Sequence, residues 1–157
     1  MISYRKAKTE DVKELLPKLR AVDVVELLLS AGPEYGKALL DSVAMCRGKA
    51  EAAIDAEGNV IAILGCCYVE SNTNLGVPFM VCSDEVDKYP KQVVKDAKAR
   101  TLKWNKKHPV LVNMVHSQNK TTIKWLQRIG YTIGELNENW GYASAPFYQF
   151  YKVNQNV

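Results

Sequence analysis

The chain has 157 residues, of which 47% are hydrophobic and 24% charged, and its formal net charge is +4. These values are typical of one folded domain and exclude a disordered chain, so we expect a single domain spanning residues 1–157. No apolar run approaches the roughly 18 residues that a membrane-spanning helix needs, and the start of the chain shows no signal peptide. The excess of Lys and Arg lies mainly in residues 88–107 and is too small to predict a nucleic-acid partner.

In the first third of the chain, the pattern alternates between strand and helix signals. Residues 2–7 alternate as a strand does, and Thr9 is a suitable N-cap for the helix that follows. Pro17 interrupts this helix, a second apolar stretch ends at Gly32, and a third helix is expected over residues 33–45.

The remaining elements follow in a regular order. Ser83 is placed to cap a helix, and Gly130 stands where a helix ends in a left-handed residue. We expect strands at 50–55, 60–69, 77–82, 109–115, 131–136 and 146–153, helices at 90–107 and from Asn119 to 129, and an aromatic loop at 137–145. This order favours an α/β (α+β) fold with helices packed on both faces of one sheet.

The cysteines predict buried thiols and no metal centre. Cys46, Cys66, Cys67 and Cys82 form no CxxC pair and have no nearby His that could complete a zinc site. We therefore expect free thiols in the core, in a reducing compartment. Cys66 and Cys67 are adjacent in a predicted strand, so their side chains should point to opposite faces of the sheet.

One stretch carries a family resemblance. Asn119, Ile123, Gly130 and Tyr131 match the "N…AI…GF" segment of the GNAT (acyl-CoA N-acyltransferase) superfamily, and the order of elements resembles that of the same family. The resemblance implies a single GNAT-like domain with a central mixed, mostly antiparallel sheet. Residues 20–27, 62–65, 78–81 and 83–84 further resemble a phage branch that includes the internal virion protein A of short-tailed podophages, which implies a location in the host cytoplasm, the virion or both.

The segment that corresponds to the family's pyrophosphate loop departs from the pattern. In the family, backbone N–H groups of a glycine-rich loop hold the pyrophosphate of acyl-CoA. Residues 82–91 contain no glycine, Val86 stands where the family usually has Arg, and Asp84, Glu85 and Asp87 carry negative charge that repels a diphosphate. Two interpretations stay open: a helix start capped by Ser83, or a modified acyl-CoA site. The contacts expected for a modified site are Met80, Val81, Cys82, Lys88, Lys91 and Asn119.

The acid and base of a transferase are also not obvious. Many members of the family place a Tyr general acid at the position that is Leu126 here, and leucine has no proton to donate. Tyr131 is the nearest phenol, although its position is normally part of the core. Glu70 and His116 are candidate general bases. For His116, the sequence favours a turn residue that caps or hydrogen-bonds locally over a general base.

Two hypotheses follow. The first is a phage accessory or internal virion-type protein with a degenerate acyl-CoA site, non-catalytic and without a certain cofactor. It would act in virion morphogenesis or on a host protein, and Trp140 and Tyr142 are its candidate partner-binding residues. The alternative is an acetyl-CoA-dependent N-acetyltransferase with a non-standard pyrophosphate loop. In this enzyme, backbone N–H groups after Met80 would stabilise the oxyanion.

Overall fold

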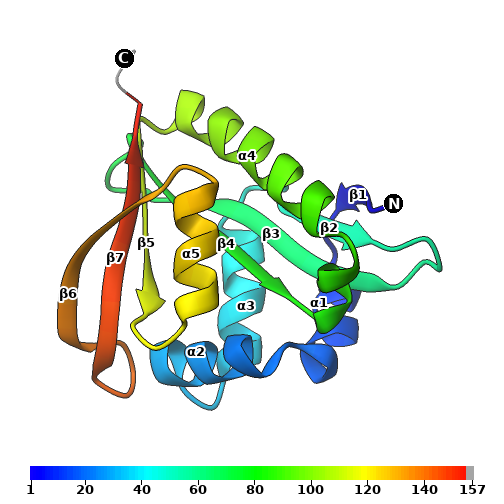
Figure 1. Cartoon of the computed structure of the whole chain (residues 1–157), viewed down its shortest axis with the longest axis horizontal. Coiled ribbons are helices and arrows are strands. Elements are labelled where there is room, and N and C mark those ends of the chain that lie inside the picture. The colour runs from blue at the N-terminus through cyan, green and yellow to red at the C-terminus, as the bar shows by residue number, and fades with distance from the viewer. Residues whose placement is uncertain (155–157) are drawn as a thin grey trace.

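Figure 1 shows the computed structural model of the chain, which describes residues 1–154. Seven strands form one sheet in the order β1-β2-β3-β4-β5-β7-β6. All neighbouring strands are antiparallel except β4 and β5, which confirms the predicted mixed, mostly antiparallel sheet. The strands are β1 (Ser3–Lys6), β2 (Glu51–Ile54), β3 (Val60–Tyr68), β4 (Leu75–Cys82), β5 (Val110–His116), β6 (Thr132–Trp140) and β7 (Ala145–Val153).

Helices cover both faces of this sheet, as predicted. In Figure 1, α4 and α5 lie in front of the sheet, α1 and α3 lie behind it, and α2 runs below the ends of β4 and β5. The helices are α1 (Thr9–Leu15), α2 (Ala21–Ala31), α3 (Tyr35–Ala44), α4 (Pro90–Lys107) and α5 (Lys120–Arg128), with short 3₁₀ segments η1 (Leu16–Lys18) and η2 (Asp84–Lys88). Pro17 lies in η1, so the predicted interruption of the first helix is confirmed.

The hydrophobic core is split between the two faces. Cys67 belongs to the cluster under α1 and α3, whereas Cys66 packs with side chains of α4 and α5. The alternation of side chains along β3 explains this separation. All four cysteines are free and buried, as the sequence predicted.

The start of α1 differs from the prediction. Lys8, not Thr9, is the N-cap, and Asp11 provides the capping interaction by accepting a hydrogen bond from the Lys8 N–H at 2.7 Å. Asp11 also forms an ion pair with Arg5 at 2.8 Å. The hydrogen bond from Arg5 lowers the pKa of Asp11 below its usual range. A carboxylate three residues into a helix can satisfy the N-cap backbone, and this bond decided where α1 begins.

The predicted loop 137–145 is also wrong in extent. The β6–β7 pairing continues from Asn137↔Phe147 to Trp140↔Ala145, so only residues 141–144 form the turn. This turn is fixed against the end of α2, where the Tyr142 N–H donates to the Ser30 carbonyl at 3.1 Å. Polar residues of β6 face solvent on both sides, which hid its strand character from the hydrophobic pattern.

Replacing Gly65 by Ala is expected to lower the free energy of unfolding by about 1–3 kcal/mol. A Cβ at this position would lie 2.7 Å from Cys46 Sγ and 3.3 Å from Ala50 Cα, and the backbone of residue 50 cannot move freely. Gly36→Ala is the matched control, because its Cβ would meet only the flexible Leu16 side chain inside a helix. Denaturant unfolding measures both variants, and equal stability of the two would contradict the expected crowding at Gly65.

Candidate active site

A wedge opens between β4 and β5. These parallel strands pair only at Leu75↔Val110 and Gly76↔Leu111 and then separate towards their carboxyl ends. Beyond this point Asn113 Nδ2 donates to the Pro78 carbonyl at 2.8 Å, so a side chain replaces the backbone ladder. The Pro78 carbonyl and the Cys82 N–H both point away from β3, so the Met80 N–H between them also points away from β3 and into the wedge.

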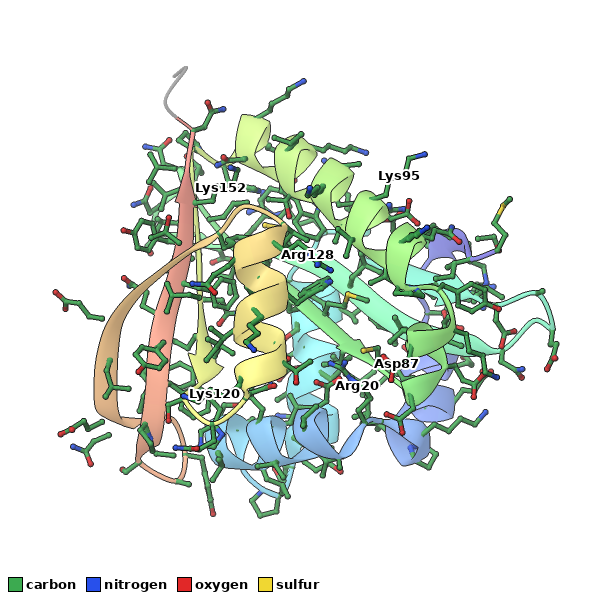
Figure 2. All side chains as sticks on the ribbon, in the orientation of Figure 1. Arg20, Asp87, Lys95, Lys120, Arg128 and Lys152 are labelled. Carbon is green, nitrogen blue, oxygen red and sulfur yellow. The ribbon has the colours of Figure 1, made fainter. Side chains whose placement is uncertain are left out.

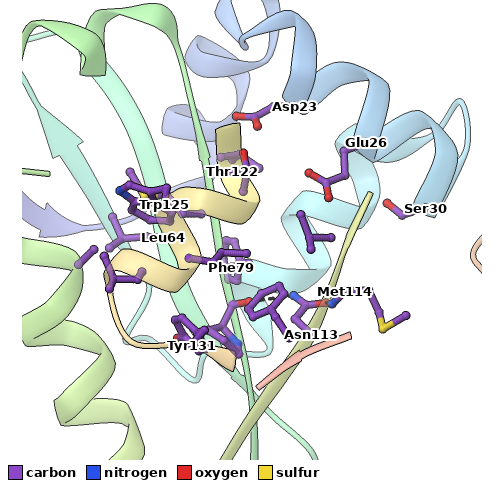
Figure 3. A pocket seen from close by; sticks show the side chains of 18 of the residues that line it. Asp23, Glu26, Ser30, Leu64, Phe79, Asn113, Met114, Thr122, Trp125 and Tyr131 are labelled. Carbon is purple, nitrogen blue, oxygen red and sulfur yellow. Dashed lines mark hydrogen bonds between the residues drawn. The ribbon is translucent and has the colours of Figure 1, made fainter. Parts of the chain in front are cut away.

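A largely apolar cavity of about 190 Å³ lies over this wedge, between α4 and α5. Figure 3 shows Asp23, Glu26 and Ser30 of α2 at one end of it and Tyr131 at the other. The walls between them are Leu64, Phe79, Met80, Val81, Ala97, Thr101, Trp104, Val115, Thr122, Trp125, Leu126 and Ile129, with Trp140, Phe147 and Phe150 on the β6–β7 side.

Glu26 lines this cavity and has a raised pKa. Its carboxylate accepts hydrogen bonds from the His116 backbone N–H at 2.7 Å and from Asn119 Nδ2 at 3.2 Å. The pKa of Glu26 is raised to about 7: burial is the largest cause and nearby Asp23 adds to it, while the two hydrogen bonds and Arg20 partly oppose the rise. A carboxyl group with this pKa exchanges protons near neutral pH, as a general base requires.

Asp23, one helical turn before Glu26, has a different role. Its carboxylate pairs with Arg20 at 3.1 Å and accepts the backbone N–H of Cys82 at 2.9 Å. The Arg20 N–H in turn donates to the Cys82 carbonyl at 2.9 Å. Asp23 therefore ties the start of α2 to the end of β4. Figure 2 shows that Arg20 also lies beside Asp87 of η2.

The segment after β4 forms a capped turn. Ser83 is the N-cap of η2, and its Oγ accepts the Glu85 N–H at 3.3 Å. The Ser83 N–H donates to the Ile61 carbonyl at 2.9 Å, and the Val86 N–H donates to the Ser83 carbonyl. The cap predicted at Ser83 is confirmed, and these backbone donors are already used within the protein.

Tyr131 lies inside the cavity. It is 5% exposed, and its hydroxyl accepts a hydrogen bond from Thr101 Oγ1 at 3.3 Å. Burial raises the pKa of Tyr131 well above its ordinary value, so this phenol keeps its proton. Leu126 lines the same cavity.

The two candidate bases chosen from sequence lie elsewhere. Glu70 is exposed in the β3–β4 connection, at the closed end of the wedge, and it does not line the cavity. His116 ends β5 at the open end, but its ring packs against Phe147, with 5.3 Å between centroids. Its contact with the site runs through its backbone N–H and Glu26.

Some of the residues expected to contact a cofactor lie at the cavity, and others lie on the surface. Met80 and Val81 line the cavity, and Asn119 is buried beside Glu26. Lys88 is exposed and pairs with Glu85 at 2.6 Å, and Lys91 is exposed in the first turn of α4. The buried Cys82 has its N–H occupied by Asp23.

The two partner-binding candidates differ in exposure. Trp140 lines the cavity and packs on Phe147 at 4.8 Å between centroids. Tyr142 is 69% exposed in the β6–β7 turn, beside the end of α2. Within residues 1–154, no group of three His, Cys, Asp or Glu side chains could hold a metal ion, and none of the helices described there is long and apolar enough to cross a membrane.

Sequence reasoning missed Glu26 and Asp23. The available signal was a pair of acids three residues apart in the otherwise apolar run AVDVVELLL, which places both on one side of a helix. That spacing marks a shared face. It does not say that the face lies against the open end of two strands far along the chain.

No protein-family model matches the sequence, and no curated protein matches it. Solved structures do match over nearly the whole chain. Ard1 from Thermoplasma volcanium is 12% identical, with 97% of both chains covered and a TM-score of 0.72. A GNAT superfamily phosphinothricin acetyltransferase from Sinorhizobium meliloti, in complex with AcCoA, is 13% identical, with 97% of this chain and 88% of that chain covered and a TM-score of 0.64.

Spermidine N-acetyltransferase from Vibrio cholerae, in complex with CoA and spermine, is 10% identical, with 97% of this chain and 95% of that chain covered and a TM-score of 0.69. These likenesses establish that the chain has the GNAT fold, as the sequence resemblance predicted. At such low identity they concern the fold alone.

Proposed function

We propose that the chain is an acetyl-CoA-dependent N-acetyltransferase with a non-standard pyrophosphate turn. One observation carries the proposal: Glu26, with a pKa of about 7, stands at the open end of the β4–β5 wedge and lines the apolar cavity. The solved GNAT structures with bound AcCoA or CoA support the choice of cofactor.

The cavity fits the acyl end of such a cofactor. Its apolar walls exclude water, and the Met80 N–H points into the wedge, where it can donate to a carbonyl oxygen that gains negative charge. Acetyl-CoA supplies an activated thioester. Glu26 accepts the proton that the acceptor amine loses as its nitrogen forms the new bond to the acetyl carbon. The departing thiolate of CoA takes its proton from solvent, because the raised pKa of Tyr131 keeps the proton on the phenol and makes this side chain a poor general acid.

The diphosphate end is where this chain must differ from the family pattern. The N–H groups of Cys82, Ser83 and Glu85 are bonded within the protein, and no glycine lies in the turn. The remaining candidate donors are Lys91 and the first turn of α4, which carries no side-chain cap. We therefore propose weaker diphosphate binding than a glycine-rich loop provides.

Titration calorimetry with acetyl-CoA tests cofactor binding. We expect wild-type protein to bind in the micromolar range. Thr122→Trp should weaken binding by about tenfold or more, because Thr122 lines the cavity and the indole would fill it. Thr121→Trp is the matched control, because Thr121 is exposed on the same turn and lines no part of the cavity.

If the wild-type protein showed no binding at millimolar acetyl-CoA, the transferase proposal would be rejected. It would favour the second candidate, a non-catalytic protein on the GNAT fold, which the Ser83-capped turn supports. The phage branch, the protein partner and the location in host cytoplasm or virion rest on sequence resemblance and remain predictions.

A further inference from the structure

A second pocket lies on the other flank of α4, over β2 and β3. It encloses about 530 Å³ and is lined by Lys49, Glu51, Cys66, Tyr68, Ala99, Arg100, Lys103, Trp104, Lys107 and His108. Trp104 lines both this pocket and the apolar cavity, so its side chain stands between them. The transferase chemistry proposed above uses none of the charged groups in this second pocket.

The pocket has a strong excess of positive charge. Four cations line it (Lys49, Arg100, Lys103 and Lys107) against one carboxylate, Glu51, which leaves an excess of three charges. Arg100 and Glu51 neutralise each other through an ion pair at 2.6 Å. Among residues 1–154, none of the ion pairs involves the three lysines.

Tyr68 contacts two of these cations, Lys49 and Lys107, and also Arg47. Lys49 Nζ donates to its hydroxyl at 3.2 Å, Lys107 Nζ lies 4.8 Å from its ring centroid, and Arg47 Cζ lies 4.2 Å from the same centroid. The ring also packs edge-on against the buried His108 at 5.0 Å between centroids. Partial burial tends to raise the pKa of Tyr68, but Lys107 and Lys49 outweigh it and lower that pKa below its ordinary value.

The backbone that brings Arg47 and Lys49 to this place is unusual. Arg47 has a φ of +51°, a region that non-glycine residues seldom occupy, and Gly48 follows at +79°. The Tyr68 N–H donates to the Met45 carbonyl at 3.0 Å, which anchors the turn to the end of β3. This turn sets Arg47 over the Tyr68 ring and Lys49 against the Tyr68 hydroxyl.

We propose that this pocket binds a polyphosphate group, supplied by inorganic triphosphate or by a nucleoside triphosphate. Phosphate oxygens accept hydrogen bonds from ammonium and guanidinium groups, and a chain of phosphates matches several cations better than a single anion does. The cations surround a cavity, whereas the backbone of a nucleic-acid duplex is bound along an open basic surface.

Titration calorimetry with sodium triphosphate and with ATP tests the proposal. Wild-type protein should bind at least one of them, and the double variant Lys49→Gln/Lys107→Gln should bind about tenfold more weakly or worse. If only ATP binds, the source is the nucleotide; if both bind equally, the phosphates suffice. Lys106→Gln is the control, because Lys106 is exposed next to Lys107 but lines neither pocket. The proposal would be overturned if wild-type protein bound neither triphosphate nor ATP, or if Lys106→Gln lost as much affinity as the double variant. It would also be overturned if duplex DNA bound more tightly than these ligands and its affinity fell equally in Lys106→Gln.

A second measurement uses Tyr68 itself. Difference absorbance titrations of wild type against Tyr68→Phe give the pKa of this phenol. Triphosphate should raise that pKa, because the anion neutralises the cations that lower it; an unchanged pKa at saturating triphosphate would argue against binding here.

The double variant Lys49→Gln/Lys107→Gln should keep wild-type affinity for acetyl-CoA. An equal loss for both ligands would assign the pocket to the cofactor site and reject it as a separate one, whereas failure of acetyl-CoA alone would concern only the transferase proposal.

Discussion

Replacing Glu26 by Gln is expected to lower acetyl transfer by about 10²- to 10³-fold, because a positioned general base contributes on that order. The amide keeps the size of the side chain but cannot accept the proton. Affinity for acetyl-CoA should stay at the wild-type value. The assay is release of free CoA thiol from acetyl-CoA in the presence of a polyamine, lysine or a short peptide. Glu34→Gln, an exposed acid outside the cavity, is the control and should leave transfer unchanged.

The pH profile gives the same prediction a second readout. Because the pKa of Glu26 in the folded protein is about 7, wild-type kcat/KM should rise with pH through that value and then level off. A flat profile in wild type, or transfer by Glu26→Gln at the wild-type rate, would remove Glu26 from the reaction.

The free energy of unfolding should also depend on pH through the titration of Glu26. The pKa of Glu26 is about 7 in the folded state against an ordinary value of 4.5, so the folded state binds the proton more tightly. The stabilisation that protonated Glu26 gives the folded state is fully present below pH 4.5. It is lost as pH rises through 7, which lowers the free energy of unfolding by an amount on the order of 3 kcal/mol. Glu26→Gln should remove this part of the pH dependence, which urea unfolding at a series of pH values measures without any acceptor amine.

Replacing Asp23 by Ala is expected to lower the free energy of unfolding by about 3 kcal/mol or more. The substitution leaves the largely buried Arg20 guanidinium without its partner and removes the acceptor of the Cys82 N–H at the end of β4. Asp23→Asn should lose less, since one oxygen can still accept from Cys82. Asp41→Ala, an exposed acid on α3, is the control and should change stability by less than about 0.5 kcal/mol.

Chemical unfolding followed by circular dichroism measures all three variants. A loss for Asp23→Ala no larger than that for Asp41→Ala would show that the link between α2 and β4 contributes nothing. The pKa of Glu26 should also fall in Asp23→Ala, because the neighbouring negative charge that raises it is gone.

The sequence by itself determined the order of elements and most of their ends. The α4 bounds, Pro90 and Lys107, follow from a proline in the first turn and an apolar stripe at helical spacing. Ser83 as a cap, Gly130 as a left-handed helix end with a φ of +111°, and the opposite faces of Cys66 and Cys67 were also predictable, because each depends on residues close in sequence. The family pattern of Asn119, Ile123, Gly130 and Tyr131 then selected the fold.

Only the tertiary structure decided which groups share the site. Glu26 meets the His116 N–H across 90 positions of sequence, and Asp23 meets the Cys82 N–H across 59. The raised pKa of Glu26 is caused mainly by burial, which no local pattern encodes, so the sequence favoured His116 and Glu70 instead. Hydrophobic periodicity fixes which face of a helix turns inward, but the place where β4 and β5 separate depends on long-range packing, and that separation positions the candidate base.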